Sequence, residues 1–234
     1  MPVVAARGLR KRFGGVRALD GVDLDFEEGM VYAIIGPNGS GKTTLLNVLT
    51  GYVKPDEGRV ETLGRDTTRW PPHRIARLGV ARVFQIPLLF HTMTVYDNVA
   101  LANPSLTHSE VMGLLRLVGL EHKAWERAGR LSGGQQKLVE IARALARHPK
   151  ILYMDEPTAG VNPGLFPTLE RVIREAREEG ATIIIIEHNV RFVSRLADEM
   201  IAMAQGRVIA RGAPSEVTRN PLVIEAYLGT EHHH

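Results

Sequence analysis

The feature that most constrains this chain is a set of short apolar runs that each end in polar residues. They are MVYAII at 30–35 before Gly36, ILYM at 151–154 before Asp155 and Glu156, and TIIII at 182–186 before Glu187 and His188. Continuous apolar runs of this length are typical of strands buried on both faces of a parallel sheet. Ligands of such sheets bind beyond the carboxyl ends of the strands. The polar residues after the runs are therefore expected to lie at one site.

Helical patterns separate these runs, which predicts an α/β fold with a mostly parallel sheet. From about residue 86 to residue 150 the pattern is mainly helical, with apolar faces over 109–120 and 135–147. The segments 7–25 and 59–65 are expected to add an antiparallel β layer. The sequence thus predicts a sheet core with a helical insertion.

Composition places the chain among ordinary globular proteins. Hydrophobic residues make up 44% of the chain and charged residues 24%. A length of 234 residues is enough for one large domain or two small ones. No apolar stretch approaches the ~20 residues of a membrane helix, and the N-terminus has no secretory pattern. The absence of cysteine excludes disulfides and thiolate metal sites. The net charge of +3 without a basic run argues against a nucleic-acid partner.

A glycine-rich motif follows the first apolar run. GPNGSGKT at 36–43 fits the phosphate-loop pattern G-x-x-x-x-G-K-[ST], between a strand pattern and a helix pattern as the motif requires. Glycines let backbone N–H groups approach phosphates, and the helix N-terminus favours an anion. A plain glycine turn is the alternative. The expected nucleotide-binding residues are Gly36, Pro37, Asn38, Gly39, Ser40, Gly41, Lys42, Thr43 and Thr44, with Lys42 on the terminal phosphates and the Thr43 hydroxyl on Mg²⁺.

Two acids follow the second apolar run. Asp155 in this position can hold Mg²⁺ through water, and Glu156 can orient or deprotonate an attacking water. A capped loop explains many isolated Asp-Glu pairs. The phosphate loop in the same chain favours the catalytic interpretation.

A second glycine turn, LSGGQ at 131–135, opens the later helix. Ser132 can cap this helix, and Gly133 and Gly134 leave their N–H groups unshielded. An ordinary N-cap explains Ser132 but neither the two glycines nor Gln135. Because one nucleotide needs only one cradle, the second turn indicates a second binding role.

GPNGSGKTT, LSGGQ, ILYMDEPTAG and His188, in this order and spacing, resemble the ATP-binding cassette of ABC transporters. The resemblance covers essentially the whole chain, from Val3 to about Gly229. It implies a P-loop NTPase fold and a single ATPase domain. The implied parts are a domain over 1–230, a core at 1–85 and 150–217, a helical subdomain at about 86–149 and a helical tail at 218–230, with 231–234 resembling a purification-tag remnant.

The resemblance also implies a head-to-tail dimer with a second copy or a related cassette. Each ATP would lie between the phosphate loop of one copy and the LSGGQ of the other. Ser132 and Gly134 would then contact the γ-phosphate in trans, with Gly133 and Gln135 in the same site. This arrangement gives the second glycine turn a function.

Further positions follow from the family pattern. Phe13, beside Val16, matches the aromatic residue that stacks on adenine, the alternative being a core aromatic. Gln85 matches the glutamine that senses Mg²⁺ and the γ-phosphate and couples to the membrane partner, the alternative being a surface glutamine. His188 matches the histidine that bonds the γ-phosphate, the alternative being a structural histidine. The implied catalytic set is Glu156, His188 and Gln85, and the implied metal set is Thr43, Gln85 and Asp155.

Several separated segments resemble the ATPases of branched-chain amino acid (Liv-type) importers and their urea or hydrophobic-substrate relatives. They are RKRFGGVRAL at 10–19, RVFQIPLLFHTMTVYDNV at 82–99, AGVNP at 159–163, IEHNV at 186–190 and NPLVIEAYLG at 220–229. Two departures stand out. The stretch 98–131 is shorter than usual in that group, and Asn162 stands where many cassettes carry aspartate. Lipopolysaccharide-export ATPases are a nearby alternative.

The resulting expectation is an ATP-binding and ATP-hydrolysing subunit that energises transmembrane import from the cytoplasmic face of the cell membrane. Its partners would be transmembrane permease subunits and, indirectly, a periplasmic or extracellular substrate-binding protein. Three other classes stay open: an ABC-type ATPase acting on nucleic acid or ribosomes, a small-molecule kinase, and a binding module without hydrolysis. LSGGQ and His188 argue against the kinase, and Glu156 argues against the module.

Overall fold

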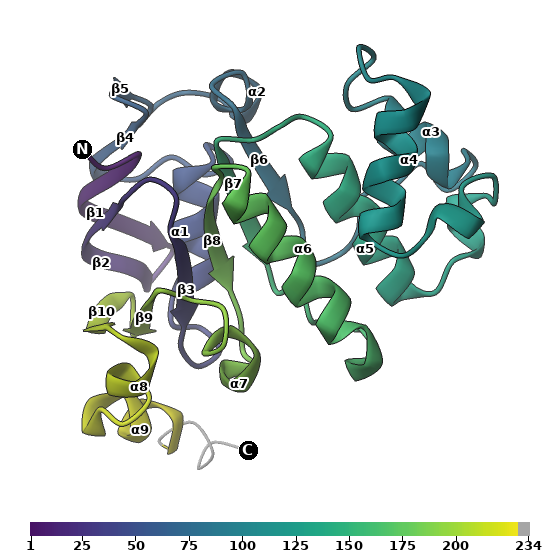
Figure 1. The fold of residues 1–234 in the computed structure, drawn as a ribbon. Helices are drawn as coiled ribbons and strands as arrows, with labels where there is room; N and C mark the ends of the chain where they lie inside the picture. The colour runs from purple at the N-terminus through teal and green to yellow at the C-terminus, as the bar shows by residue number, and fades with distance from the viewer. Residues whose placement is uncertain (229–234) are drawn as a thin grey trace.

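The computed structural model describes residues 1–228, which form two β-sheets and the helices around them (Figure 1). The predicted tag remnant at 231–234 and the end of the predicted tail lie outside the described residues. The larger sheet has the order β10-β9-β3-β8-β7-β6. Its strands are β3 (Val31–Ile35), β6 (Val80–Val83), β7 (Ile151–Asp155), β8 (Thr182–Ile186), β9 (Glu199–Ala204) and β10 (Arg207–Gly212).

The predicted mostly parallel sheet is confirmed. Strands β6, β7, β8, β3 and β9 pair in parallel, and only the edge strand β10 is antiparallel to its neighbour. Every residue of β3, β7 and β8 is buried, as their continuous apolar runs predict. These three strands are the centre of the sheet.

The predicted antiparallel layer is also confirmed, as a second sheet with the order β2-β1-β4-β5. Its strands are β1 (Val4–Phe13), β2 (Val16–Phe26), β4 (Glu57–Thr62) and β5 (Arg65–Asp66). Along β2, Val22, Leu24 and Phe26 are buried while the acids between them face outward. The alternation follows from the two-residue period of a strand with one wet face.

The pleat of the central strand divides the core into two clusters. Tyr32 and Ile34 pack in the cluster that contains α1 (Lys42–Leu49) and the antiparallel sheet. Val31, Ala33 and Ile35 pack on the opposite face, in the cluster that contains the longer helices. The parallel sheet is therefore covered on both faces, which its apolar composition requires.

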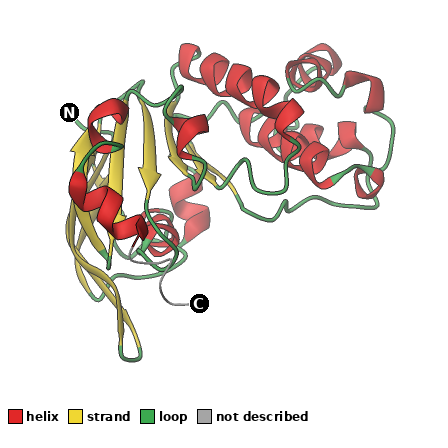
Figure 2. Cartoon of the chain, turned by 90° about the horizontal axis from the view of Figure 1, so that it is seen from below, coloured by secondary structure: helices red, strands yellow, loops and turns green. Residues whose placement is uncertain are grey.

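The remaining helices lie around this core. They are α2 (Pro72–Ala76), α3 (Val95–Ala100), α4 (His108–Leu117), α5 (Gly133–Leu145), α6 (Phe166–Glu178), α7 (Val190–Val193), α8 (Pro214–Val217) and α9 (Pro221–Leu228). Short 3₁₀ helices occur at Glu121–Lys123, Ala128–Arg130 and Pro163–Leu165. Figures 1 and 2 show α3, α4 and α5 gathered on one side of the molecule, away from the antiparallel sheet.

The two predicted helices of this region exist, with different ends. The helix expected over 109–120 ends at Leu117 because Gly119 adopts φ 72°, a left-handed conformation that terminates helices. The helix expected over 135–147 begins two residues earlier. There Ser132 and Gln135 form a capping box, in which each side chain accepts the other's backbone N–H. No helix in the described part of the chain is long and apolar enough to cross a bilayer.

Candidate functional site

The carboxyl ends of β3, β8 and β7 are adjacent, because these strands are neighbours in the sheet and run in the same direction. The phosphate-loop motif follows β3, Asp155 ends β7 with Glu156 directly after it, and Glu187–His188 follows β8. The sheet therefore collects at one edge the residues that the sequence predicts to share a site.

Lys42 lies at the start of α1 and is 5% exposed. Its ammonium donates to the carbonyl oxygens of Gly36 at 2.7 Å and Pro37 at 2.9 Å, and to the Ser40 hydroxyl at 3.2 Å. Burial lowers the pKa of Lys42, and the negative charges of Glu156 and Asp155 oppose that shift. The loop thus curls around a cation that a phosphate can pair with.

The loop's glycines are required by close backbone approaches. At Gly41, with φ 101°, a Cβ would overlap the carbonyl oxygen of Ala18 on β2. At Gly36 a Cβ would overlap the carbonyl oxygen of Met203 on β9. The phosphate loop is therefore wedged between the two sheets, which argues against the plain flexible turn.

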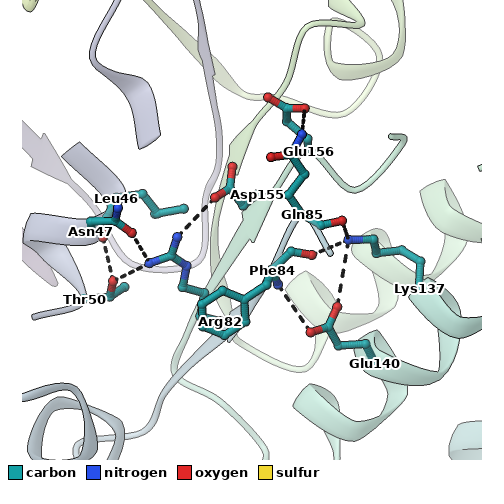
Figure 3. A network of polar contacts seen from close by, with 10 residues as sticks. All are labelled: Leu46, Asn47, Thr50, Arg82, Phe84, Gln85, Lys137, Glu140, Asp155 and Glu156. Carbon is teal, nitrogen blue, oxygen red and sulfur yellow. Dashed lines mark hydrogen bonds and ion pairs between the residues drawn. The ribbon is translucent and has the colours of Figure 1, made fainter. Parts of the chain in front are cut away.

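Gln85, Glu156 and His188 come together although they are far apart in the sequence. The Gln85 amide donates to Glu156 Oε2 at 2.8 Å (Figure 3), and His188 Nε2 lies 2.8 Å from Glu156 Oε1. Glu156 has φ 48°, which is unusual for a residue other than glycine. Residues in such strained conformations are concentrated at functional sites. Gln85 is exposed, as the surface-glutamine alternative expects, but its amide is bonded to Glu156.

Glu187 stabilises the two turns that carry Glu156 and His188. It is 2% exposed, and its carboxylate accepts the backbone N–H groups of Thr158 at 2.7 Å, His188 at 3.0 Å and Asn189 at 3.1 Å. These bonds join the turn after Glu156 to the turn that carries His188. The sequence shows Glu187 only as a neighbour of His188, and its partners depend on the pairing of β7 with β8.

Asp155 is paired with an arginine that the sequence does not single out. Arg82 on β6 donates to Asp155 Oδ2 at 3.1 Å, to Asn47 on α1 at 2.8 Å, and to Thr50 directly after α1 at 2.9 Å (Figure 3). Burial raises the pKa of Asp155, whereas the Arg82 charge lowers it. The sequence pattern that could have indicated this role is an arginine inside the otherwise apolar strand β6. The contact ties the phosphate-loop helix to β7.

The residues present fit a magnesium ion. Asp155 Oδ1 is buried and makes no hydrogen bond within the described residues, and Thr43 is an exposed residue in the first turn of α1. The described chain has no cluster of three His, Cys, Asp or Glu side chains that could hold a metal alone. One hydroxyl and one carboxylate suit Mg²⁺, which proteins commonly hold through few side chains together with substrate phosphates.

Other predicted residues lie apart from this cluster. Ser132–Gln135 form the N-terminus of α5, where Gly134 faces Val161. Phe13 is 51% exposed and Val16 68% exposed, at the tip of the β1–β2 hairpin, so the core-aromatic alternative for Phe13 is wrong. Asn162 caps a 3₁₀ helix by accepting the Gly164 N–H at 2.8 Å.

Comparison with known families decides the family. Residues 19–159 match the family described as ABC transporter, and residues 207–233 match the family described as branched-chain amino acid ATP-binding cassette transporter. The chain belongs to the ABC transporter family. Among relatives of this cassette is a protein of Archaeoglobus fulgidus named probable branched-chain amino acid transport ATP-binding protein LivG. The two are 39% identical over 249 residues, covering 99% of this chain and 97% of the relative.

Solved structures agree with the ABC assignment. The ADP conformation of MJ1267, an ATP-binding cassette of an ABC transporter, superposes with a TM-score of 0.89 and 38% identity, covering 98% of this chain and 99% of that chain. A dimeric post-hydrolysis state of the cassette MJ0796 bound to ADP and Pi gives 0.81 and 27% identity, covering 90% and 98%. The expected P-loop NTPase fold of this cassette is confirmed.

The wedged phosphate loop yields a stability prediction. Gly41→Ala is expected to destabilise more than Gly21→Ala, which has a similar positive φ but open space around its Cα. The control bears only the strain of a left-handed alanine, about 1–2 kcal/mol. Gly41→Ala adds a steric overlap worth about 1–3 kcal/mol. Urea unfolding of both variants measures the difference, and equal losses would contradict the close approach to Ala18.

Proposed function

We propose that this chain is the ATP-hydrolysing subunit of an importer for branched-chain amino acids. The observation that carries this proposal is the full-length similarity to the LivG relative, together with the family match at residues 207–233. The proposed ATPase domain spans 1–230, with the helical part at about 86–149. It acts on the cytoplasmic face of a membrane, bound to permease subunits that recognise the cargo with a substrate-binding protein.

The proposed roles combine the family pattern with the geometry of the cluster. Lys42 binds the terminal phosphates, and the Thr43 hydroxyl, Asp155 and Gln85 hold Mg²⁺. Bound Mg²⁺ neutralises phosphate charge during phosphoryl transfer. Glu156 accepts a proton from the attacking water. Gln85 and His188 orient its carboxylate through the two bonds of 2.8 Å.

The N-terminus of α5 is proposed to bind the nucleotide of a second cassette. Ser132 and Gly133 are exposed there, and an α-helix N-terminus presents unpaired N–H groups to an anion. The capping box already uses the Gln135 N–H, at 3.3 Å from the Ser132 hydroxyl. The glycine N–H groups therefore provide the donors, and the partner cassette provides the phosphate.

A groove beside Gln85 suits a permease segment. A cavity of about 370 Å³ is lined by the apolar residues Tyr52, Phe84, Phe90 and Leu101, and by basic residues including Arg143. The side chains of Tyr52, Phe90 and Leu101 are more than half exposed. Apolar walls with a guanidinium group fit an amphipathic helix that carries an acidic side chain. Its position beside Phe84 would place the permease next to the residue that contacts Glu156.

Removing the Lys42 ammonium is expected to weaken nucleotide binding. One or two charge-assisted bonds of roughly 1.5–3 kcal/mol each correspond to at least about a tenfold loss in ATP affinity. Lys54→Ala is the matched control, because Lys54 also donates to backbone carbonyls, those of Gly51 and Trp70, outside the loop. Titration with ATP checks both variants. Unchanged affinity in Lys42→Ala would exclude the assigned role.

Glu156→Gln is expected to lose about 10²- to 10⁴-fold in turnover, the usual contribution of a general base. Gln keeps the shape of the side chain, so ATP binding should persist and the ATP-bound dimer should accumulate. Phosphate release and light scattering measure the two effects, with Glu178→Gln at the exposed end of α6 as the control. A variant that hydrolyses ATP at the wild-type rate would rule out Glu156 as the base.

Co-purification tests the transport function. Tagged protein from gently solubilised native membranes should recover multi-spanning permease subunits, and vesicles containing the complex should import leucine with ATP. Leu101→Asp should release the permease, whereas Leu228→Asp, at an equally exposed leucine of α9, should retain it. Recovery of ribosomes or nucleic acid would contradict the proposal. If the vesicles import urea or extract lipopolysaccharide instead, that compound would replace branched-chain amino acids as the proposed substrate.

A further inference from the structure

Three side chains of α5 hold the segment that carries Gln85. Lys137 donates to the carbonyl oxygens of Phe84 and Gln85, the second at 2.6 Å (Figure 3). Glu140 Oε1 accepts the N–H groups of Phe84 at 3.5 Å and Leu88 at 3.2 Å. Arg143 donates to the Leu88 carbonyl at 2.6 Å.

The segment depends on these contacts because it has left the sheet. Strand β6 ends at Val83, and the backbone hydrogen bonds recorded for residues 84–88 within the described chain go to α5 side chains. Lys137, Glu140 and Arg143 follow one another at spacings of three residues, so they form one stripe along the helix. The stripe and the segment therefore form one unit.

A contribution to folding stability does not explain why Lys137 and Glu140 are buried. Lys137 is 1% exposed and Glu140 3% exposed, with Nζ and Oε2 3.9 Å apart. Burial lowers the pKa of Lys137 and raises the pKa of Glu140, so both charged forms carry a desolvation cost. Buried ion pairs can often be replaced by apolar residues without loss of stability. A function that uses their hydrogen bonds accounts for their presence.

The contacts connect two parts of the proposed mechanism. The N-terminus of α5 is the LSGGQ turn, which is proposed above to bind the nucleotide of a second cassette. The same helix holds the backbone of Gln85, and the side chain of Gln85 bonds Glu156 at 2.8 Å. A displacement of α5 therefore displaces Gln85 relative to Glu156.

We propose that Lys137 and Glu140 are positioning residues that make Gln85 move with α5. Through them, a nucleotide bound at Ser132–Gln135 by the partner cassette controls the carboxylate of Glu156 in this chain. This inference rests on the proposed function. It adds the residues through which one nucleotide site of the dimer regulates the other.

The test removes both charges together, because removing one would leave the other buried without its counter-charge. Lys137→Met with Glu140→Leu is expected to stay folded, with a Tm close to that of the wild type. ATP affinity should be retained, whereas kcat should fall about 10- to 100-fold, the scale expected when a catalytic group is misplaced by about 1 Å. The single variant Lys137→Arg, with Glu140 in place, keeps the donors and should retain most of the wild-type kcat.

A matched control uses the same residue types at the same spacing on the surface. Lys123 and Glu126 form an i,i+3 pair at 3.2 Å, partly exposed to solvent. Lys123→Met with Glu126→Leu should leave kcat and ATP affinity at wild-type values. A folded Lys137→Met/Glu140→Leu variant with wild-type kcat would overturn the proposal. A fall of Tm and ATP affinity in Lys137→Met/Glu140→Leu, with kcat equally low in Lys137→Arg, would also overturn it, because it would indicate a purely structural role.

A second measurement does not need hydrolysis. In the Glu156→Gln background, ATP should slow amide hydrogen exchange at residues 132–135 and at residues 84–88. With Lys137→Met and Glu140→Leu added, ATP should protect only 132–135. Persistent ATP-dependent protection at 84–88 would contradict the coupling. An inactive wild-type protein would instead count against the proposed ATPase, so the two failures are distinguishable.

Discussion

Strands β3, β8 and β7 are hydrogen-bonded neighbours that run in the same direction, so their carboxyl ends lie side by side. Burial on both faces fixes their register, because a slip of one residue would exchange the side chains that face the two core clusters. The phosphate loop, the Asp155–Glu156 pair and the turn of His188 therefore meet through backbone pairing. The Glu156 N–H even donates to the carbonyl of Ile186 at the end of β8, at 2.9 Å. The contact between His188 and Glu156 follows from this alignment, whereas the contact with Gln85 also needs the segment after β6.

Buried charges join this edge of the sheet to the helices. Arg82 links Asp155 on β7 to Asn47 on α1 and to Thr50, which caps the end of α1. Lys137 links α5 to the segment after β6. The two networks meet at Phe84. The Arg82 guanidinium lies 4.6 Å from the centre of the Phe84 ring, and the Phe84 carbonyl accepts a hydrogen bond from Lys137. Burial disfavours the charged forms of Arg82, Lys137 and Glu140, so each network carries a desolvation cost.

The residues that the sequence could not identify share one property. Arg82, Lys137, Glu140 and Glu187 are charged residues beside apolar ones, a pattern that indicates a solvated face in most proteins. Their roles depend on long-range neighbours, such as the backbone of residues 84–88 against α5. By contrast, Lys42, Asp155, Glu156 and His188 belong to local motifs at strand ends. The helix ends shifted by a few residues because capping by Ser132 and the backbone of Gly119 outweigh the apolar periodicity.

The sequence by itself determined the α/β class, the strands at the centre of the sheet, the family and the phosphate loop, because these depend on local periodicity and on contiguous motifs. Only the tertiary structure decided that Gln85 and His188 both contact Glu156, that Arg82 holds Asp155, and that α5 holds the segment carrying Gln85. These contacts join residues separated by tens of positions. Their formation depends on the order of strands in the sheet and on which side chains are buried, and neither is encoded in a short stretch of sequence.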